Sequence, residues 1–578
     1  MEDLEAENTE PPVVEEAIGE IDEDTSMLKR EKLKLFFSTS WRGIVCVLTP
    51  IILIALLVPF PPEKYQWCAY TLVLMAIYWV TECLPLPITS FLPVVIFPLT
   101  GVMNTTTTCK CYMNDTIIMF IASMALAYAV EQSGLHKRLA LCAIRAIGYS
   151  HYRLLFAMCF TTMFVSMWIT NTAATTMMVP INFGLLKVFE DQNLLIIYKT
   201  SKDGEPVSSS ITTCYFCAST YSATIGGIGT LVGTATNLVF KGLFQKAFPK
   251  APEFLSFPKF SGFSIPYMLV MEILLYIYLL IAFFGFLRPN SAAAKRSKIT
   301  KEGVEAAKAT VTEQWNDLGR ITFWEIMVII LFVGAMILFF CRSPQLFNGW
   351  GDLIPEYFDL KTRTFVRDSA AAMLVIFFML LLPSNLDFLK HFTSKEDESP
   401  DKPIPSVLNW SIMNDILPYG FMFLLGGGFA LSMAAKKEYS DLNGQIGIFL
   451  KNLQTLPNYL IILLIILFTI FITNFAANVA VANVIVPILM QLAVEINIHP
   501  LWYNIAAGFS ASYCFCLPVG TPGNLVVQSA AKIPTASMIV VGAVPTLTTI
   551  IVTWIAICFW APVVWPELHY TNNTLFLK

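Results

Sequence analysis

Long apolar segments separated by polar loops make up most of this 578-residue chain. A helix that crosses a membrane needs about 20 mainly apolar residues, and about eleven segments meet this requirement. They lie near residues 43–60, 67–84, 86–101, 116–134, 211–233, 262–286, 323–341, 367–384, 414–435, 501–518 and 537–561. The pattern predicts an all-α polytopic membrane protein.

Two further apolar segments, 152–189 and 456–496, are each interrupted by a short polar break. The first break contains Thr170-Asn171-Thr172, and the second contains Asn478. Non-helical backbone at membrane depth is tolerated only where it is buried in protein or lines a cavity. We therefore expect two re-entrant hairpins, each entering and leaving on one side of the membrane, with tips that face an aqueous site.

The two hairpins belong to an internal repeat. Aligning Asn171 with Asn478 also aligns Pro180 with Pro487, and G-T-A-T-N at 233–237 resembles G-T-P-G-N at 520–524. Each half has a hairpin with Asn at its tip, followed by a span that G-T-x-x-N breaks. The first hairpin is predicted to open inside and the second outside, so the repeats are inverted. Inverted repeats with broken helices indicate a secondary transporter whose site lies near the bilayer midplane.

Composition and charge support this interpretation and orient the chain. Hydrophobic residues make up 56% and charged residues 13%, whereas soluble domains carry about 25% charged residues. Lys and Arg cluster before the first span and after the sixth, and both clusters are expected on the cytoplasmic side. The N-terminus is then cytoplasmic and the C-terminus extracellular, where Asn572 begins a glycosylation sequon. Asn104 and Asn114 begin sequons in an outer loop close to the membrane.

The pattern predicts five regions in a multi-pass protein of the plasma membrane. They are a disordered acidic cytoplasmic tail (1–40), a first repeat with spans one to six (41–290), a cytoplasmic linker (291–322), a second repeat with spans seven to eleven (323–565) and an extracellular tail (566–578).

The helix breaks offer chemistry for an anion and a cation together. A break frees N–H groups that favour an anion and carbonyl groups that favour a cation. An Asn amide adds an oxygen for a hard cation such as Na⁺ and an NH₂ group for a carboxylate. Asn and Thr in apolar helices also serve as helix-packing contacts. The recurrence of an Asn tip and G-T-x-x-N in both halves favours a binding site instead.

Other functional classes find less support in the sequence. No Walker loop, zinc-ligand spacing or hydrolytic triad is present, so an enzyme is not predicted. A passive anion channel is an alternative, although a channel does not need inverted repeats. Glu82, Glu272 and Glu325 are candidates for a proton relay, but Glu82 and Glu325 lie near predicted span ends, where a structural or interfacial role is expected. Nothing indicates a nucleic-acid partner.

Several segments resemble a known family, the divalent anion/sodium symporters, which include sodium-coupled citrate and dicarboxylate transporters and the INDY proteins. They are A-S-Y-C-F-C-L-P-V-G-T-P-G-N-L-V-V at 511–527, W-V-T-E-C-L-P-L-P-I-T-S at 79–90, S-M-W-I-T-N-T at 166–172 and L-L-G-G-G-F-A-L at 424–431. G-T-A-T-N and A-N-V-A-V-A-N look most like insect INDY-type proteins. The resemblance implies a homodimeric elevator-type transporter of di- and tricarboxylates such as citrate and succinate, with no cofactor except a possible Na⁺.

The resemblance also implies roles for individual residues. Substrate contacts would come from Asn171, Thr172, Asn478, Val479, Thr521 and Pro522, with Gly427 allowing a close approach. A first cation site would use Ser166, Asn171, Thr234 and Asn237, and a second would use Thr473, Asn478, Thr521 and Asn524.

The chain departs from the family pattern in its polar residues. Ala477 and Val479 remove two hydroxyls beside Asn478, and Ala235 replaces a Gly that is common in sodium-coupled relatives. The first tip is therefore predicted to be better equipped for a cation. These departures weaken the case for Na⁺ without removing it. The resemblance to insect-type proteins favours cation-independent, electroneutral exchange, with Na⁺-coupled symport as the alternative.

Overall fold

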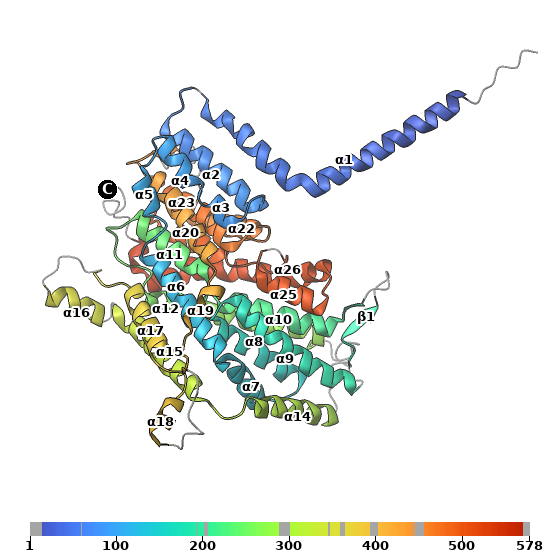
Figure 1. The fold of residues 1–578 in the computed structure, drawn as a ribbon, viewed down its shortest axis with the longest axis vertical. Coiled ribbons are helices and arrows are strands. Elements are labelled where there is room, and N and C mark those ends of the chain that lie inside the picture. Colours follow the sequence, from blue (N-terminus) through green and yellow to red (C-terminus); the bar gives the residue numbers. More distant parts are fainter. Residues whose placement is uncertain are drawn as a thin grey trace, which may run out of the picture.

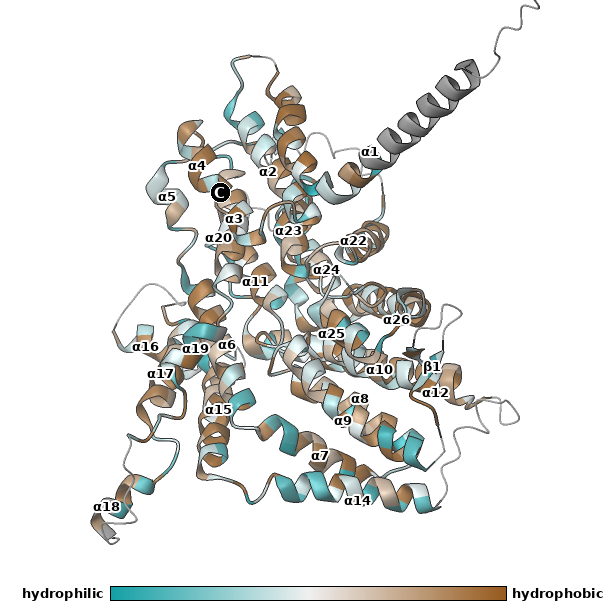
Figure 2. Ribbon diagram, turned by 45° about the vertical axis from the view of Figure 1, so that its right-hand side comes forward, coloured by the Kyte–Doolittle hydropathy of each residue, from teal (hydrophilic) through white to brown (hydrophobic). Residues whose placement is uncertain are grey.

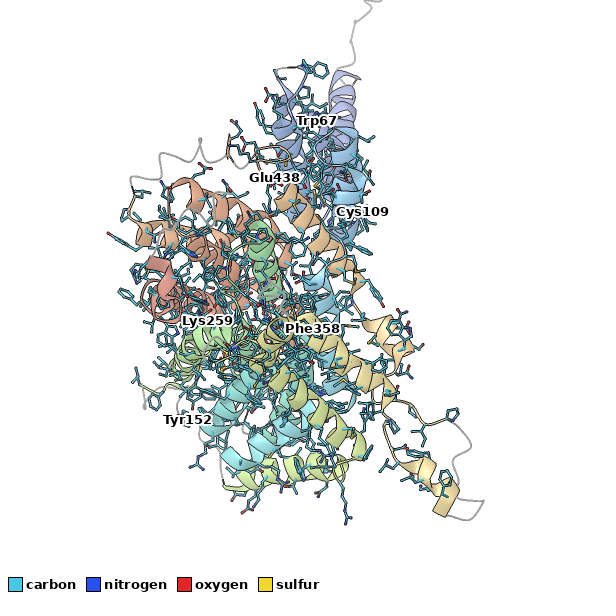
Figure 3. All side chains as sticks on the ribbon, turned by 90° about the vertical axis from the view of Figure 1, so that its left-hand side faces the viewer. Trp67, Cys109, Tyr152, Lys259, Phe358 and Glu438 are labelled. Atoms are coloured by element: carbon cyan, nitrogen blue, oxygen red, sulfur yellow. The ribbon has the colours of Figure 1, made fainter. Side chains whose placement is uncertain are left out.

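Helices form almost all of the computed structural model, which describes residues 14–58, 60–192, 195–200, 206–287, 301–344, 347–358, 365–393, 403–442, 444–445, 456–518 and 520–569 (Figure 1). The strands in these ranges are β1 (Tyr198–Thr200) and β2 (Pro206–Ser208), which pair antiparallel in the loop after the first hairpin. Side chains fill the space between the helices (Figure 3).

Within the described residues, 7 helices are long and apolar enough to cross a membrane. They are Lys34–Leu57, Asp115–Gln132, Asn171–Asp191, Phe257–Phe284, Phe323–Arg342, Asn478–Glu495 and Thr535–Val564. Shorter apolar helices occupy Leu86–Leu99, Asp368–Leu381, Tyr419–Ala434 and Asn458–Thr473. The all-α polytopic prediction is confirmed, while the number of crossings stays a prediction.

Helix α1 runs from Val14 to Leu53, and its C-terminal part contacts α2, where the Tyr78 hydroxyl donates to the Cys46 carbonyl at 2.6 Å. Residues from Val14 onward have a helical backbone, and residues 1–13 lie outside the described residues. The segment is rich in Glu, Leu and Lys, which are good helix formers. The disordered tail over 1–40 stays a prediction.

The first repeat contains the predicted hairpin as two helices, α8 and α9, separated by a break at 167–170. The span that follows is broken, as predicted, between α10 and α11. The helices of this half are α2 (Lys64–Thr81), α3 (Leu86–Thr89), α4 (Leu92–Leu99), α5 (Thr105–Cys109), α6 (Asp115–Gln132), α7 (Leu135–Ile147), α8 (His151–Ser166), α9 (Asn171–Asp191), α10 (Ser210–Gly226), α11 (Ala235–Ala247) and α12 (Phe257–Phe284).

The second repeat has the same order, with hairpin α22–α23 and a broken span α24–α25. Its helices, with the linker helix before them, are α14 (Lys301–Asp317), α15 (Phe323–Arg342), α16 (Trp350–Tyr357), α17 (Asp368–Leu381), α18 (Lys390–Thr393), α19 (Trp410–Ile416), α20 (Tyr419–Ala434), α22 (Asn458–Thr473), α23 (Asn478–Glu495), α24 (Leu501–Ser510), α25 (Pro522–Ala531), α26 (Thr535–Ile555) and α27 (Ala561–Val564).

Two helices with mixed polar and apolar residues, α7 and α14, lie side by side at one edge of the molecule (Figure 2). Arg138 on α7 binds Glu325 at the start of α15, with its Nε 2.9 Å from Oε1. Glu325 also forms a capping box with Thr322, so Glu325 holds helix ends together, as its position near a span end predicts. Burial lowers the pKa of His136 on α7, which keeps this side chain uncharged at neutral pH.

The helices pack into two main groups. In the first, α8 and α10 contact each other and both contact α9 and α12, and α25 and α26 join them. In the second, α6, α15 and α17 contact one another, while α12 and α15 meet at few positions. Helix α11 packs chiefly against α23 and α24. The broken helices therefore lie close together, near the centre of the molecule (Figure 1).

Candidate functional site

The breaks begin and end at the residues that the sequence singled out. Helix α9 begins at Asn171 and α23 at Asn478, directly at the two hairpin tips. Helix α11 begins directly after Thr234, and α25 directly after Thr521. Each break therefore places an Asn or Thr of the repeat beside free backbone groups at a helix end.

In the first half, hydrogen bonds tie the hairpin tip to the broken span. The Ser166 hydroxyl lies 2.9 Å from Asn171 Oδ1 and 2.7 Å from the carbonyl of Ala223 on α10. The Asn237 amide donates to the carbonyls of Gly227 at 3.0 Å and Thr230 at 2.7 Å. Asn237 thereby holds the unwound segment in a fixed shape.

The second half repeats these interactions with equivalent residues. The Thr473 hydroxyl lies 2.7 Å from the Asn478 amide and 2.7 Å from the carbonyl of Ala511, directly after α24. The Asn524 amide donates to the carbonyls of Cys514 at 3.1 Å and Leu517 at 3.0 Å. The sequence repeat thus extends to the side-chain hydrogen bonds.

A contact that the sequence did not predict joins the two halves. The Thr220 hydroxyl on α10 donates to Asn524 Oδ1 at 2.9 Å. Asn474, beside the second tip, accepts from the backbone N–H of Cys516 at 3.3 Å. Asn474 could have been found from the sequence, because I-T-N at 472–474 repeats I-T-N at 169–171. Thr220 could not, because it is one of many Ser and Thr residues in α10.

Whether these residues suit Na⁺ depends on the orientation of the Asn478 amide. The amide atom nearest Thr473 Oγ1, at 2.7 Å, also lies 3.2 Å from the Ala511 carbonyl and 3.1 Å from the Gly520 carbonyl. With nitrogen there, the amide donates to all three groups and no cation is needed. With oxygen there, four oxygens lie close together, and oxygen atoms are the ligands that a hard cation takes. The second half therefore offers an oxygen-rich set of ligands in only one of the two amide orientations.

In the first half, some buried polar atoms have no hydrogen-bond partner. Among the described residues, Asn237 Oδ1 and Thr236 Oγ1 are buried without a hydrogen-bond partner. An unpartnered amide oxygen is a potential cation ligand, and a hydroxyl can serve a cation or an anion. Thr521 Oγ1 in the second half is likewise buried and unpartnered.

The helix N-termini differ in how their N–H groups are satisfied. Thr170 caps α9 by accepting from the backbone N–H of Ala173 at 3.3 Å. Ala477 occupies the same position before α23 and offers no side-chain cap. The starts of α11 and α25 also have no side-chain cap. N–H groups that no side chain caps are suited to a carboxylate oxygen.

Glycines allow the close approach of the broken segments. A Cβ atom on Gly227 would lie 2.2 Å from Asn171 Oδ1, and one on Gly520 would lie 2.5 Å from the Thr473 carbonyl. Gly427 is different, because its Cβ would meet Ser90 rather than a hairpin tip. The close approach at Gly427 is therefore to the 86–91 segment.

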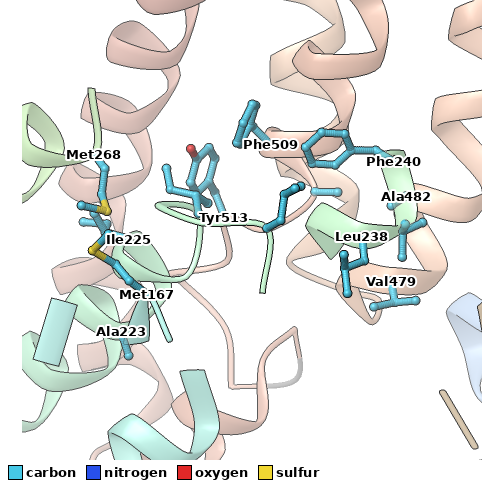
Figure 4. Packing of buried hydrophobic residues seen from close by; sticks show 14 of the residues in the cluster. Met167, Ala223, Ile225, Leu238, Phe240, Met268, Val479, Ala482, Phe509 and Tyr513 are labelled. Carbon is cyan, nitrogen blue, oxygen red and sulfur yellow. The ribbon is translucent and has the colours of Figure 1, made fainter. Parts of the chain in front are cut away.

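The remaining predicted contact residues differ in exposure. Asn171 and Thr172 are half-buried, Val479 is buried and Pro522 is exposed. Apolar side chains pack behind the breaks, with Leu238 beside Val479 on one side and Met167 near Met268 on the other (Figure 4). The first tip is thus more open to solvent than Val479 of the second.

The other polar candidates are engaged elsewhere. Glu272 is fully buried, and its Oε1 accepts from Ser222 at 2.6 Å. The Asn104 side chain caps α5, and Asn114 caps α6 while its amide donates to the Cys111 carbonyl at 2.9 Å. Asn572 lies outside the described residues. Within them, no three His, Cys, Asp or Glu side chains gather as metal ligands.

Comparisons with known proteins agree over nearly the whole chain. The family model of the sodium:sulfate symporter transmembrane region matches residues 38–566. Protein I'm not dead yet from Drosophila melanogaster is 38% identical over 550 residues, which cover 93% of this chain and 92% of that protein. Na(+)/dicarboxylate cotransporter 3 of mouse is 32% identical, over 92% of this chain and 95% of that protein. Na(+)/citrate cotransporter of rat is 31% identical, over 92% of this chain and 98% of that protein. Among solved structures, the YdaH transporter of Alcanivorax borkumensis matches 80% of this chain and 88% of its own, with 15% identity and a TM-score of 0.48.

Proposed function

Because the chain belongs to the family of the sodium:sulfate symporter transmembrane region, we propose that it is a secondary transporter of di- and tricarboxylates such as citrate and succinate, in the plasma membrane. It is a multi-pass membrane protein of a transporter family, not of an enzyme family. The observation that carries the proposal is the duplicated set of Asn-centred hydrogen bonds at two helix breaks. The names of the relatives supply the substrate class.

The proposed site binds an anion without a fixed positive charge. Asn171 and Thr172 at one tip and Asn478 at the other offer amide and hydroxyl groups, and the start of α25 adds backbone N–H groups beside Thr521. Val479 and Pro522 bound the space with apolar surface. A buried Arg would cost several kcal/mol in the membrane and would hold the anion tightly. Neutral donors allow the carboxylate to bind and to leave.

Uptake of labelled citrate and succinate tests this function. Cells that produce the chain should accumulate at least one of the two above the level in control cells, and unlabelled dicarboxylate should compete. A passive channel would instead carry a current far above transporter turnover. Absence of uptake of both anions would contradict the proposed function.

We propose that transport is cation-independent exchange, with Na⁺-coupled symport as the alternative. The nitrogen-inward orientation of Asn478 satisfies Thr473, Ala511 and Gly520 without a cation. A bound Na⁺ would supply a positive charge beside the substrate, and Thr473, Asn478 and the two carbonyls would hold it in the oxygen-inward orientation. The first set, from Ser166, Asn171, Thr234 and Asn237, would have Asn237 Oδ1 as its free ligand.

Replacing Na⁺ with choline separates these two modes. We expect most of the citrate uptake to persist, because the amide contacts do not require a cation. The measurement is initial uptake in Na⁺ and in choline buffers at one pH, with preloaded dicarboxylate to drive exchange. Loss of uptake in choline would establish Na⁺ coupling.

The orientation of the termini is also proposed, with the N-terminus cytoplasmic and the C-terminus extracellular. We expect Asn572→Gln to remove a glycosidase-sensitive shift in electrophoretic mobility. Asn114→Gln should leave the shift, because the Asn114 amide is occupied by the Cys111 carbonyl, and Asn104→Gln should leave it too. A shift that persists in Asn572→Gln would contradict an extracellular, glycosylated C-terminus.

We further propose that residues 41–290 and 323–565 form the two halves of the transporter, and that two copies of the chain associate. Differently tagged copies should then co-purify in mild detergent. Separate elution of the two tags would contradict the dimer.

A further inference from the structure

Four charged side chains form a closed, buried cluster outside the helix breaks. Lys241 Nζ lies 2.8 Å from Asp368 Oδ2 and 3.1 Å from Glu253 Oε1. Arg342 Nη2 lies 2.7 Å from Glu253 Oε2, and Arg342 Nε donates to Asp368. The side chains are only 3% to 11% exposed. Each charge therefore has two partners of opposite sign, and the cluster is neutral.

The four residues come from two different parts of the fold. Lys241 lies on α11, and Glu253 lies in the segment between α11 and α12. Arg342 is the last residue of α15, and Asp368 is the first residue of α17. Arg342 and Asp368 thus belong to the helix group of α6, α15 and α17. The cluster joins that group to the segment that carries the first half-site.

Helix α11 links the cluster to the proposed site. Asn237, which holds the unwound segment, lies one turn before Lys241 on the same helix. A second ion pair, from Arg367 Nη1 to Asp115 at 2.9 Å, is extended by Gln245 of α11 at 3.1 Å. Direct packing between α12 and α15 is sparse. The charged residues therefore tie the α11 segment to α15 and α17, beside the packing of α11 against α6.

Among the described residues of the second repeat, no equivalent cluster is found. Aligning the G-T-x-x-N motifs places Lys241 against Gln528 on α25. The Gln528 amide donates to Thr535 Oγ1 at 2.8 Å, at an exposed position. Transporters built from inverted repeats change access by moving one part against the other. A strong tie in only one repeat would favour one of the two end states.

We propose that Lys241, Glu253, Arg342 and Asp368 form a latch that holds the α11 segment against α15 and α17 in one end state of the transport cycle. This inference rests on the proposed transport function. The latch must open when the two parts move, because its partners come from both. Its strength then sets the populations of the two states, and therefore the affinity at each membrane face.

A double substitution, Lys241→Met with Glu253→Gln, removes every ion pair of the latch that joins the α11 segment to α15 and α17. It leaves Arg342 and Asp368 paired with each other and keeps the net charge. The matched control is Lys259→Met with Glu567→Gln, which removes a more exposed pair at 3.4 Å. Substrate affinity is measured separately at each face in proteoliposomes of one orientation. Affinity should rise at one face and fall at the other, each by roughly 10-fold, with maximal rates kept within a few-fold.

A merely structural role would lower the amount of protein or the maximal rate without opposite changes in affinity. Affinities that stay unchanged, or that change in the same direction at both faces, would therefore overturn the latch. Wild-type protein without any carboxylate uptake would refute the proposed function itself, and the latch with it.

Cross-linking gives a second, independent measurement. Lys241→Cys with Asp368→Cys leaves Arg342 paired with Glu253. In a chain whose other reactive cysteines are replaced, a short bis-methanethiosulfonate reagent can join the two new thiols through reducible disulfides, with methanesulfinate as the leaving group. Uptake should stop when the link forms and return on reduction. Uptake that continues at the unlinked rate, with the link confirmed, would show that α11 and α17 do not separate and would overturn the latch.

Discussion

Replacing Asn171 or Asn478 with alanine is expected to abolish the uptake of citrate and succinate. Each amide stands at a hairpin tip, and Ser166 or Thr473 holds it against the broken span. Alanine removes the proposed substrate contact and leaves the buried hydroxyl of Ser166 or Thr473 without its amide partner. A buried polar group left unpaired costs about 1–3 kcal/mol, and every 1.4 kcal/mol is about tenfold in binding. Losing both the substrate contact and the buried hydrogen bond predicts that uptake falls on the order of 100-fold.

Matched controls separate this effect from a general loss of stability. Asn182 on α9 and Asn483 on α23 are buried asparagines further along the same helices. They donate to Ser219 at 3.0 Å and to the Leu424 carbonyl at 3.1 Å, away from the tips. Asn182→Ala and Asn483→Ala should reduce the amount of protein at the surface but keep uptake per molecule.

The measurement is initial uptake of labelled citrate and succinate, divided by surface protein that is quantified by biotinylation. Tip variants that keep at least half of the wild-type uptake would contradict the proposed site. An equal loss in the tip and control variants would show that the asparagines matter for folding alone.

The sequence predicted the hairpins and the broken spans because their signals are local. A polar residue within a long apolar run is conspicuous, and the second copy of each motif identifies it again. Asn171 begins α9 and Asn478 begins α23, at the predicted tips. Ala477 lacks the hydroxyl with which Thr170 caps α9, and α23 has no side-chain cap.

Contacts between distant segments had no such signal. Thr220 reaches Asn524 across the repeat boundary, and nothing in α10 distinguishes this hydroxyl from its neighbours. Arg342 and Asp368 lie at the ends of predicted spans, where charged residues are ordinary. Their pairing with Lys241 depends on how α11 packs against α15 and α17, which periodicity does not encode.

Replacing Gly227 with alanine should reduce uptake almost as severely as Asn171→Ala, although glycine makes no polar side-chain contact. Gly227 ends α10 at φ −58, which alanine also adopts, so no backbone strain is expected. Its new Cβ would lie 2.2 Å from Asn171 Oδ1 and 3.0 Å from both Cγ and Nδ2. The Asn171 side chain must then leave the position in which Ser166 meets it.

Gly262→Ala is the control for this substitution, because nothing lies within 4 Å of a Cβ at that position in α12. Alanine in a helix interior is about 0.5–1 kcal/mol more stable than glycine, so Gly262→Ala should keep full uptake. The comparison is uptake per surface molecule, with substrate affinity measured for any residual activity. Because the displaced amide contacts substrate in the proposed site, Gly227→Ala should weaken affinity as well as rate by about tenfold or more, the loss expected when one buried polar contact is removed. Wild-type affinity in Gly227→Ala would mean that Asn171 does not bind substrate from its position in this structure.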